Sequence, residues 1–135
     1  KVSQHDMDTS AIGDPVGLIS GINKVYFETD KEISERLCSL GANIDINTSI
    51  RPITSGDLFV EKDSDKKRIS DNFEADVCEM EGGSIGHVAF VNNTPFAVVR
   101  AISDAGDGMD FVTFADKAAK NSIKLIMSFL ESVQK

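Results

Sequence analysis

Segments with strand-like and helix-like patterns alternate along this chain, and that alternation restricts the fold more than any other feature. Four runs of strand-like character are expected at 2–8, 46–61, 74–81 and 96–102. A helical pattern separates each run from the next, and another follows the last run. This order predicts an α/β domain with three layers, αβα, around a mixed, largely parallel central sheet.

Capping residues and glycines mark the expected helix ends. Thr29-Asp30-Lys31-Glu32 is a capping box with Thr29 as the cap, and Gly41 ends the helix that it begins. Ser64 caps a second helix, in which Ile69 and Phe73 face inward. Between Asp8 and Asn23, closely spaced turn formers predict a long loop of the kind that is often functional.

The two later helices are predicted in the same way. Gly82-Gly83 begins a helix with an inner face of Ile85, Val88 and Ala89. Asp110 caps the last helix, which is long. Its inner face is expected to be the apolar stripe formed by Ala119, Ile123, Ile126, Leu130 and Val133.

The charge balance bears on possible partners. The formal net charge is −8, which argues against a nucleic-acid backbone or an anionic membrane as the main partner. No uninterrupted apolar run approaches membrane-spanning length. Cys38 and Cys78 lie in apolar surroundings without a CxxC motif, so we expect reduced core thiols in a cytoplasmic protein.

Carboxylates follow two of the predicted strands. The run at 74–81 ends in Glu79 and Glu81, and Ser103 and Asp104 follow the run at 96–102. A helical crossover makes these two strands parallel, so their carboxyl ends share the edge where α/β sheets bind ligands. If the run at 46–61 joins the sheet in the same sense, Phe59 and Val60 reach this edge as well. A solvated acidic loop is the alternative for the residues after 102.

These residue types suit cleavage of the N-glycosidic bond of a nucleoside, which breaks through an oxocarbenium-like ribose. Asp104, if burial keeps it protonated, can protonate the purine. Glu81 can accept the ribose hydroxyls and stabilise the developing charge, and Phe59 offers a stacking face. Arg100 either orients a water or carboxylate or forms a structural ion pair with Glu79. Protonation and electrostatics suffice for this bond, so no metal or organic cofactor is expected.

Two blocks of sequence carry a resemblance to a known family. Cys-Glu-Met-Glu-Gly-Gly-Ser-Ile-Gly-His-Val-Ala and Asn-Thr-Pro-Phe-Ala-Val-Val-Arg-Ala-Ile-Ser-Asp resemble the 5′-methylthioadenosine/S-adenosylhomocysteine nucleosidases, in the nucleoside phosphorylase superfamily. Ser-Gly-Asp-Leu-Phe-Val, Gln-His-Asp-Met-Asp and the Phe-Val-Thr-Phe-Ala-Asp-Lys-Ala-Ala-Lys helix extend it more weakly. The resemblance implies a nucleoside phosphorylase-like fold and hydrolysis that releases adenine from these nucleosides.

The resemblance also implies a role at each matching position. Asp104 would protonate N7 of the purine, Ser103 would support it and Arg100 would help to place the water. The other matching positions would bind substrate. The backbone of Phe59 and Val60 would contact the adenine edge, and Met80 and Glu81 would hold the ribose. Glu79 would line the pocket, and Phe111 would face the 5′-alkylthio group. Members of the family form homodimers in which the partner subunit closes the 5′ pocket. The resemblance implies a homodimer here as well, with the loop at 8–23 as the segment that reaches the partner's pocket.

The chain departs from the family pattern in ways that qualify these roles. The loop between Asp107 and Phe111 is shorter than usual, and Gly82-Gly83 replaces residues that are more often alanine. Nothing matches the family's water-activating glutamate or its early glycine-rich segment. We therefore expect residues 1–135 to be the C-terminal part of a single domain that lacks its N-terminal strands, and to be inactive alone.

Other readings stay open from the sequence. The function could be purine nucleoside phosphorolysis, hydrolysis of another nucleoside such as futalosine, or nucleoside binding without catalysis. Among the residues, Met80, Phe111 and Phe114 could be core side chains, and His87 is expected to be structural. His5 is either a loop contact or an interface residue.

Overall fold

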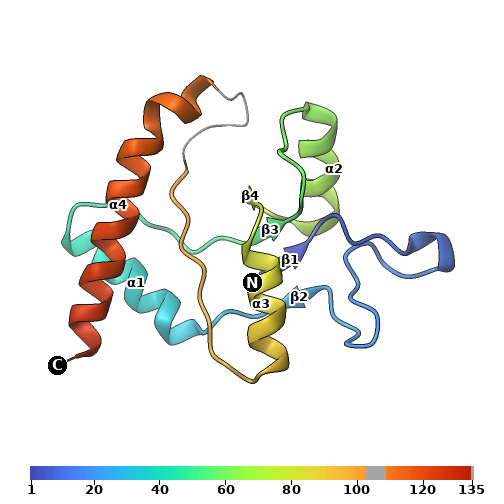
Figure 1. Cartoon of the computed structure of the whole chain (residues 1–135), viewed down its shortest axis with the longest axis horizontal. Coiled ribbons are helices and arrows are strands. Elements are labelled where there is room, and N and C mark those ends of the chain that lie inside the picture. Colours follow the sequence, from blue (N-terminus) through green and yellow to red (C-terminus); the bar gives the residue numbers. More distant parts are fainter. Residues whose placement is uncertain (103–108, 135) are drawn as a thin grey trace. The chain divides into compact units, whose positions relative to one another are not determined.

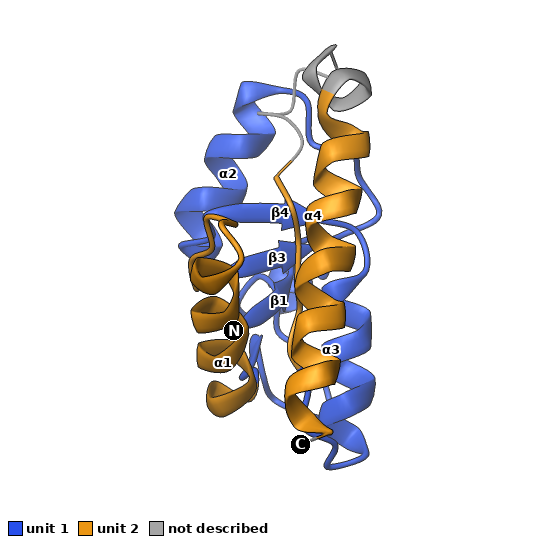
Figure 2. Ribbon diagram, turned by 90° about the vertical axis from the view of Figure 1, so that its left-hand side faces the viewer, with its two compact units in different colours: residues 1–29, 51–96 blue, residues 30–50, 97–135 orange. Residues whose placement is uncertain are grey.

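The chain forms two compact units (Figure 2). The computed structural model describes residues 1–102 and 109–134, with no description of the side chains of 109–113. Unit 1 contains residues 1–29 and 51–96, and unit 2 contains residues 30–50 and the chain from 97 onward.

A four-stranded mixed sheet forms the centre of unit 1 (Figure 1). Its strands are β1 (Val2–Gln4), β2 (Tyr26–Phe27), β3 (Ile53–Ser55) and β4 (Val77–Glu79), in the order β2-β1-β3-β4. β1 pairs with β2 antiparallel, whereas β1–β3 and β3–β4 are parallel pairs. The carboxyl ends of β1, β3 and β4 therefore lie at one edge of the sheet. The strand β2 was not predicted, although Val25-Tyr26-Phe27 has strand-forming residues.

The 3₁₀-helix η1 (Ser10–Ile12) and two α-helices, α2 (Asp63–Phe73) and α3 (Gly82–Val91), complete unit 1. The inward positions predicted for α2 are confirmed, since Ile69 and Phe73 are buried together with Val2, Ile19 and Phe27. The predicted cap is wrong: Lys62 stands at the N-cap without a side-chain hydrogen bond, and Ser64 lies inside the helix. The acidic residues Asp63 and Asp65 occupy the first turn, where the helix dipole favours negative charge.

The inner face predicted for α3 is wrong for Ile85 and Val88, whereas Ala89 is half-buried. Ile85 and Val88 are 58% and 63% exposed, whereas Gly82, Gly83 and Gly86 are buried. A Cβ atom at Gly86 would lie 2.7 Å from Val2 Cγ2, and one at Gly83 would lie 2.9 Å from the Ser3 carbonyl oxygen. The glycine side of the helix thus approaches the sheet closely, whereas Ile85 and Val88 lie on an exposed side.

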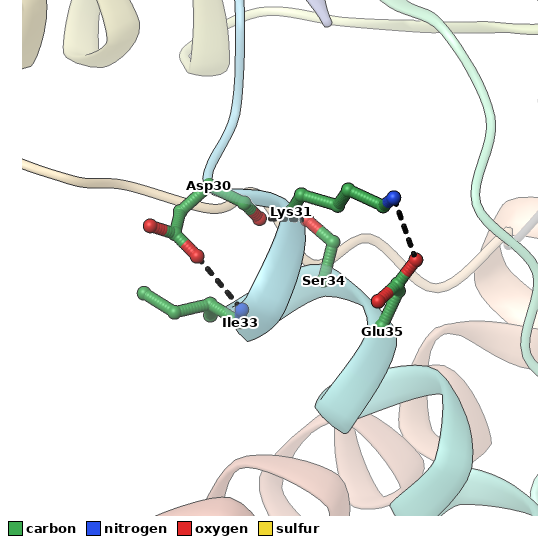
Figure 3. Close-up of polar contacts among 5 residues, drawn as sticks. All are labelled: Asp30, Lys31, Ile33, Ser34 and Glu35. Atoms are coloured by element: carbon green, nitrogen blue, oxygen red, sulfur yellow. Dashed lines mark hydrogen bonds and ion pairs between the residues drawn. The ribbon is translucent and has the colours of Figure 1, made fainter.

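Unit 2 pairs two helices, α1 (Lys31–Asn43) and α4 (Met109–Val133). Asp30, not Thr29, caps α1: its carboxylate accepts the Ile33 N–H at 2.8 Å (Figure 3). The predicted helix is confirmed, but it continues past Gly41 to Asn43. The chain can turn there because Asp45 adopts the left-handed conformation, with φ of 59°.

The stripe predicted to face inward on α4 is exposed. Among the side chains of α4 that are described, Leu125 is buried, whereas Ile123 and Val133 are 64% and 51% exposed. The helix is apolar on more than one side, so periodicity alone could not tell which side packs. Lys124 Nζ donates to the Ile44 carbonyl oxygen at 3.0 Å, which ties α4 to the end of α1.

Residues 96–102 do not form the predicted strand. Their β-branched composition favours an extended chain, but a strand also needs a neighbour for its backbone hydrogen bonds. Among the described residues, β4 ends the sheet and no strand pairs beyond it.

The thiols differ from the prediction as well. Both are free, but Cys78 is exposed and Cys38 is half-buried, so neither is a fully buried core residue. Cys38 contacts Thr48, whose hydroxyl donates to the Cys38 carbonyl oxygen at 2.9 Å. No helix in the described parts of the chain has the length and apolar character needed to cross a membrane.

Candidate functional site at the carboxyl edge of the sheet

Three segments leave the sheet at the edge where the parallel strands end. Gln4, Ser55 and Glu79 are the last residues of β1, β3 and β4, and they are aligned by the register of the two parallel pairs. Hydrogen bonds continue past the strands: the His5 N–H donates to the Ser55 carbonyl oxygen at 2.8 Å, and the Gly56 N–H donates to the Glu79 carbonyl oxygen at 3.2 Å. The first residues of the three segments are therefore held side by side.

The segment after β4 is organised by the carboxylate of Glu79. This half-buried group accepts the Gly82 N–H at 2.8 Å on each oxygen and the Glu81 N–H at 3.1 Å. It also accepts the hydroxyl of Ser55, which in turn accepts the Gly83 N–H at 2.5 Å. Glu79 thus occupies the positively polarised N-terminus of α3. It fixes the turn through which Met80 and Glu81 pass.

Met80 and Glu81 are accessible at this turn. Met80 is 43% exposed, so it is not the core side chain that was one alternative. Glu81 is exposed, and its carbonyl oxygen accepts the Ser84 hydroxyl at 2.8 Å. An acidic side chain and a thioether are thus displayed beside the start of α3.

The segment after β3 leaves the sheet at the same edge and contains Phe59 and Val60. Phe59 is 55% exposed and Val60 is half-buried. The Asp57 N–H donates to Asp6 Oδ2 at 2.8 Å, which connects this segment to the one after β1. An exposed ring and two exposed acidic side chains, Asp57 and Glu81, therefore follow neighbouring strands.

The segment after β1 contains His5, which is only 2% exposed. Neither ring nitrogen has a hydrogen-bond partner among the described residues. Burial lowers the pKa of the imidazole below its ordinary value of 6.5, although the nearby carboxylate of Asp6 acts in the opposite direction. The ring is therefore neutral at pH 7. The sequence left the role of His5 open, and the resemblance placed Asp6 only within a segment that lies beside the dimer interface in the family.

The remaining predicted site residues are not in unit 1. Ser103 and Asp104 lie outside the described residues, so the predicted approach of Asp104 to Glu81 is not described. Arg100 is exposed and lies in unit 2, in a segment without regular secondary structure. Phe111 is in the first turns of α4, and its side chain is outside the description. Phe114 is 45% exposed.

Two further observations bear on the candidate residues. His87 stacks on Phe27, with ring centroids 5.2 Å apart and planes inclined by 12°, so its contact is structural as predicted. In the part of the chain that is described, no group of three or more His, Cys, Asp and Glu side chains is arranged to hold a metal ion.

The sequence is similar to known nucleosidases along almost its whole length. The family model described as "Phosphorylase superfamily" matches residues 1–131. The aminodeoxyfutalosine nucleosidase of Campylobacter jejuni is 32% identical over 98% of this chain and 59% of its own length. The 5′-methylthioadenosine/S-adenosylhomocysteine nucleosidase of Oceanobacillus iheyensis is 31% identical over the same shares, 98% and 59%. The chain thus spans less than two thirds of these relatives.

Solved structures agree with the sequence comparison. The native futalosine hydrolase of Helicobacter pylori superimposes with a TM-score of 0.91 at 31% identity, over 97% of this chain and 57% of that one. The 5′-methylthioadenosine/S-adenosylhomocysteine nucleosidase of the same organism, complexed with butyl-thio-DADMe-Immucillin-A, gives a TM-score of 0.91 at 32% identity, over 97% and 57%. The α/β fold class predicted from the alternation of elements is therefore confirmed.

Proposed function

The chain belongs to the phosphorylase superfamily, and from that premise we propose that it is the C-terminal part of a purine nucleosidase that hydrolyses N-glycosidic bonds and releases adenine. The observation that supports the proposal is that two segments leave neighbouring parallel strands at one sheet edge. Phe59 and Val60 follow β3, while Met80 and Glu81 follow the neighbouring parallel strand β4. Relatives that match nearly the whole chain are named as nucleosidases.

The segment after β3 supplies the purine side of the proposed site. The Phe59 ring is exposed and can stack on a base, which is worth about 1–3 kcal/mol for a base on an aromatic side chain. The backbone of Phe59 and Val60 offers N–H and C=O groups outside any helix or strand, so they are available to the hydrogen-bonding edge of adenine.

The segment after β4 supplies the ribose side. Ionised Glu81 can accept hydrogen bonds from both ribose hydroxyls and stabilise the positive charge that develops on the ring. Met80 lies beside it with an exposed, polarisable thioether. Glu79 supports this turn from the N-terminus of α3, since its carboxylate holds the Glu81 and Gly82 N–H groups. In this proposal Glu79 positions Glu81 and does not itself need to touch the ligand.

The chemical step follows from the resemblance described above. Asp104, supported by Ser103, donates a proton to N7 of the purine as the glycosidic bond breaks, and the bonding electron pair leaves with the base. A water molecule, placed in part by Arg100, adds to the anomeric carbon and loses a proton. Phe111 would contact the 5′ substituent. No segment of the sequence matches the family's glutamate that accepts this proton from water.

Two substrate classes are supported by the relatives. Hydrolysis of 5′-methylthioadenosine and S-adenosylhomocysteine is our first proposal, because the quoted motifs resemble that family. The relatives named as aminodeoxyfutalosine nucleosidase, at 32% identity, support a futalosine-type nucleoside as the second. Aminodeoxyfutalosine carries the same adenine and ribose as 5′-methylthioadenosine and differs in the 5′ substituent, so the segments after β3 and β4 serve either substrate.

We further propose a cytoplasmic homodimer in which the loop at 8–23 contributes to the partner's 5′ pocket. Ile12, in the 3₁₀-helix η1 of that loop, is 79% exposed, so its side chain is accessible to a partner subunit. A contact with the 5′ substituent of a nucleoside in the partner subunit would cover it.

The test is adenine release by the full-length protein, measured for the wild type and for Asp104→Asn with each nucleoside and with and without phosphate. We expect release without phosphate and a loss of about 10²–10⁴-fold in kcat for the variant, the usual contribution of general acid catalysis. An equal rate for Asp104→Asn would contradict the acid role. A requirement for phosphate would indicate a phosphorylase, and binding without release would indicate a non-catalytic protein.

A further inference from the structure

The base-binding segment after β3 is held by two residues that follow another strand. Asp6, two residues after the end of β1, accepts the Asp57 N–H on Oδ2 at 2.8 Å. This bond joins positions 51 residues apart in the chain. A carboxylate acceptor makes a backbone hydrogen bond shorter and stronger than a neutral one. Asp57 is thereby fixed just before the chain reaches Phe59.

The imidazole of His5 lies against the residue before Asp57. A Cβ atom at Gly56 would lie 2.6 Å from Nε2 and 2.9 Å from Nδ1 of His5, closer than real side chains approach one another. The ring therefore occupies the space next to the Gly56 backbone, and only glycine permits this approach. Ser55, Gly56 and His5 are all buried, so the contact is shielded from solvent.

Residues 56–60 form neither a helix nor a strand. The position of the Phe59 backbone therefore depends on how the preceding residues are anchored. His5 fills the space beside Gly56, and Asp6 holds the next N–H, so two consecutive residues after β1 restrain two consecutive residues after β3. Among the described residues neither ring nitrogen of His5 has a hydrogen-bond partner, so the contact that the structure gives this ring is its packing against Gly56.

We propose that His5 and Asp6 are positioning residues for purine binding: they hold Gly56 and Asp57 so that the backbone of Phe59 and Val60 meets the edge of the base. This inference rests on the proposed function, because it takes the base to bind at Phe59 and Val60. The interaction is made equally with substrate and transition state. Loss of the anchor should then raise KM and leave kcat unchanged.

The experiment compares Asp6→Ala, Asp6→Asn and Asp30→Ala in the full-length protein. Asparagine keeps an oxygen that can accept the Asp57 N–H, whereas alanine removes it. Asp30→Ala is the matched control, since it deletes a carboxylate that accepts a backbone N–H at the same distance, 2.8 Å, at the start of α1. The measurements are KM and kcat for adenine release, the calorimetric affinity for free adenine, and amide hydrogen exchange at residues 57–60.

We expect Asp6→Ala to raise KM and the adenine Kd about tenfold, equivalent to 1.4 kcal/mol, and to speed exchange at residues 57–60. Asp6→Asn should restore most of the affinity. Asp30→Ala should lower Tm and leave KM unchanged, which separates positioning from a general loss of stability. Unchanged KM and adenine affinity in Asp6→Ala, or an Asp6→Asn protein as weak as Asp6→Ala, would overturn the positioning role.

The outcomes also separate this inference from the proposed function. A wild-type protein that binds adenine but releases none would refute the nucleosidase, and the adenine affinities of the Asp6 variants would still decide the positioning role. Normal adenine release by the wild type, with KM and adenine Kd unchanged in the Asp6 variants, would refute the positioning role alone. A wild-type protein that neither releases nor binds adenine would refute both.

Discussion

Replacing Ser55 by alanine removes one hydroxyl group that serves two partners. The Ser55 hydroxyl donates to the Glu79 carboxylate and accepts the Gly83 N–H at 2.5 Å. Ser55 is 3% exposed and Gly83 is buried, so water cannot easily replace the missing group. The substitution therefore leaves a backbone N–H at the start of α3 without its partner and weakens the support of the carboxylate that caps the helix.

The expected loss can be worked from these two contacts. A buried donor left unsatisfied costs about 1–3 kcal/mol, and a hydrogen bond to a charged group contributes about 1.5–3 kcal/mol. Glu79 is only half-buried and keeps its hydrogen bonds from the Glu81 and Gly82 N–H groups. The lost bond to its carboxylate therefore costs an amount near the lower end of that range. We expect the free energy of unfolding to fall by about 3 kcal/mol in Ser55→Ala.

The assay is urea denaturation of the full-length protein, with Ser3→Ala as the control. Ser3 is 1% exposed, and its hydroxyl donates to the Thr54 hydroxyl at 3.0 Å in the same sheet, but no charge takes part. Ser3→Ala leaves the buried Thr54 hydroxyl without this neutral partner, so we expect a smaller loss of about 1–2 kcal/mol. If Ser55→Ala loses no more stability than Ser3→Ala, the double role assigned to the Ser55 hydroxyl is wrong.

Two further predictions concern the packing of unit 1. Gly86→Ala places a Cβ 2.7 Å from Val2 Cγ2 and 2.9 Å from Phe96 Cζ. The free energy of unfolding, measured by urea denaturation, should therefore fall by about 1–3 kcal/mol. Unchanged stability would refute the close approach of α3 to the sheet. Burial and the positive charge of Arg68 lower the pKa of His5 below 6.5, and together they outweigh the negative charges of Asp6 and Asp65, which raise it. The unfolded chain therefore binds the proton more readily than the folded chain. Stability should therefore fall as the pH drops below about 6.5, and His5→Leu should reduce that dependence in denaturation curves measured between about pH 8 and pH 5; an unchanged slope would exclude His5 as its source.

The sequence predicted elements well where local chemistry decides them. Ile69 and Phe73 are spaced for one face of α2, and they are buried. The start of α3 at Gly82 follows from the glycine pair. β3 and β4 are parallel, as expected, so the segments that contain Phe59 and Glu81 leave the sheet at one edge.

Predictions failed where tertiary packing chooses between alternatives. Hydrophobicity favoured Ile85 and Val88 as the inner face of α3, but the helix lies too close to the sheet for them and packs through Gly83 and Gly86. The run at 96–102 has strand-forming residues but no strand partner among the described residues. His5 and Asp6 were not assigned because their partners are about fifty positions away, and no local pattern reveals such contacts.

The capping of α3 by Glu79 has a consequence for anions. Helix N-termini attract phosphate through their exposed N–H groups and their partial positive charge. Here the protein's own carboxylate already takes the Gly82 N–H on both oxygens, and the Ser55 hydroxyl takes the Gly83 N–H. A phosphate ion arriving at this helix would meet a negative charge and N–H groups already bonded. Any phosphorolytic reaction on this scaffold would have to hold its phosphate elsewhere.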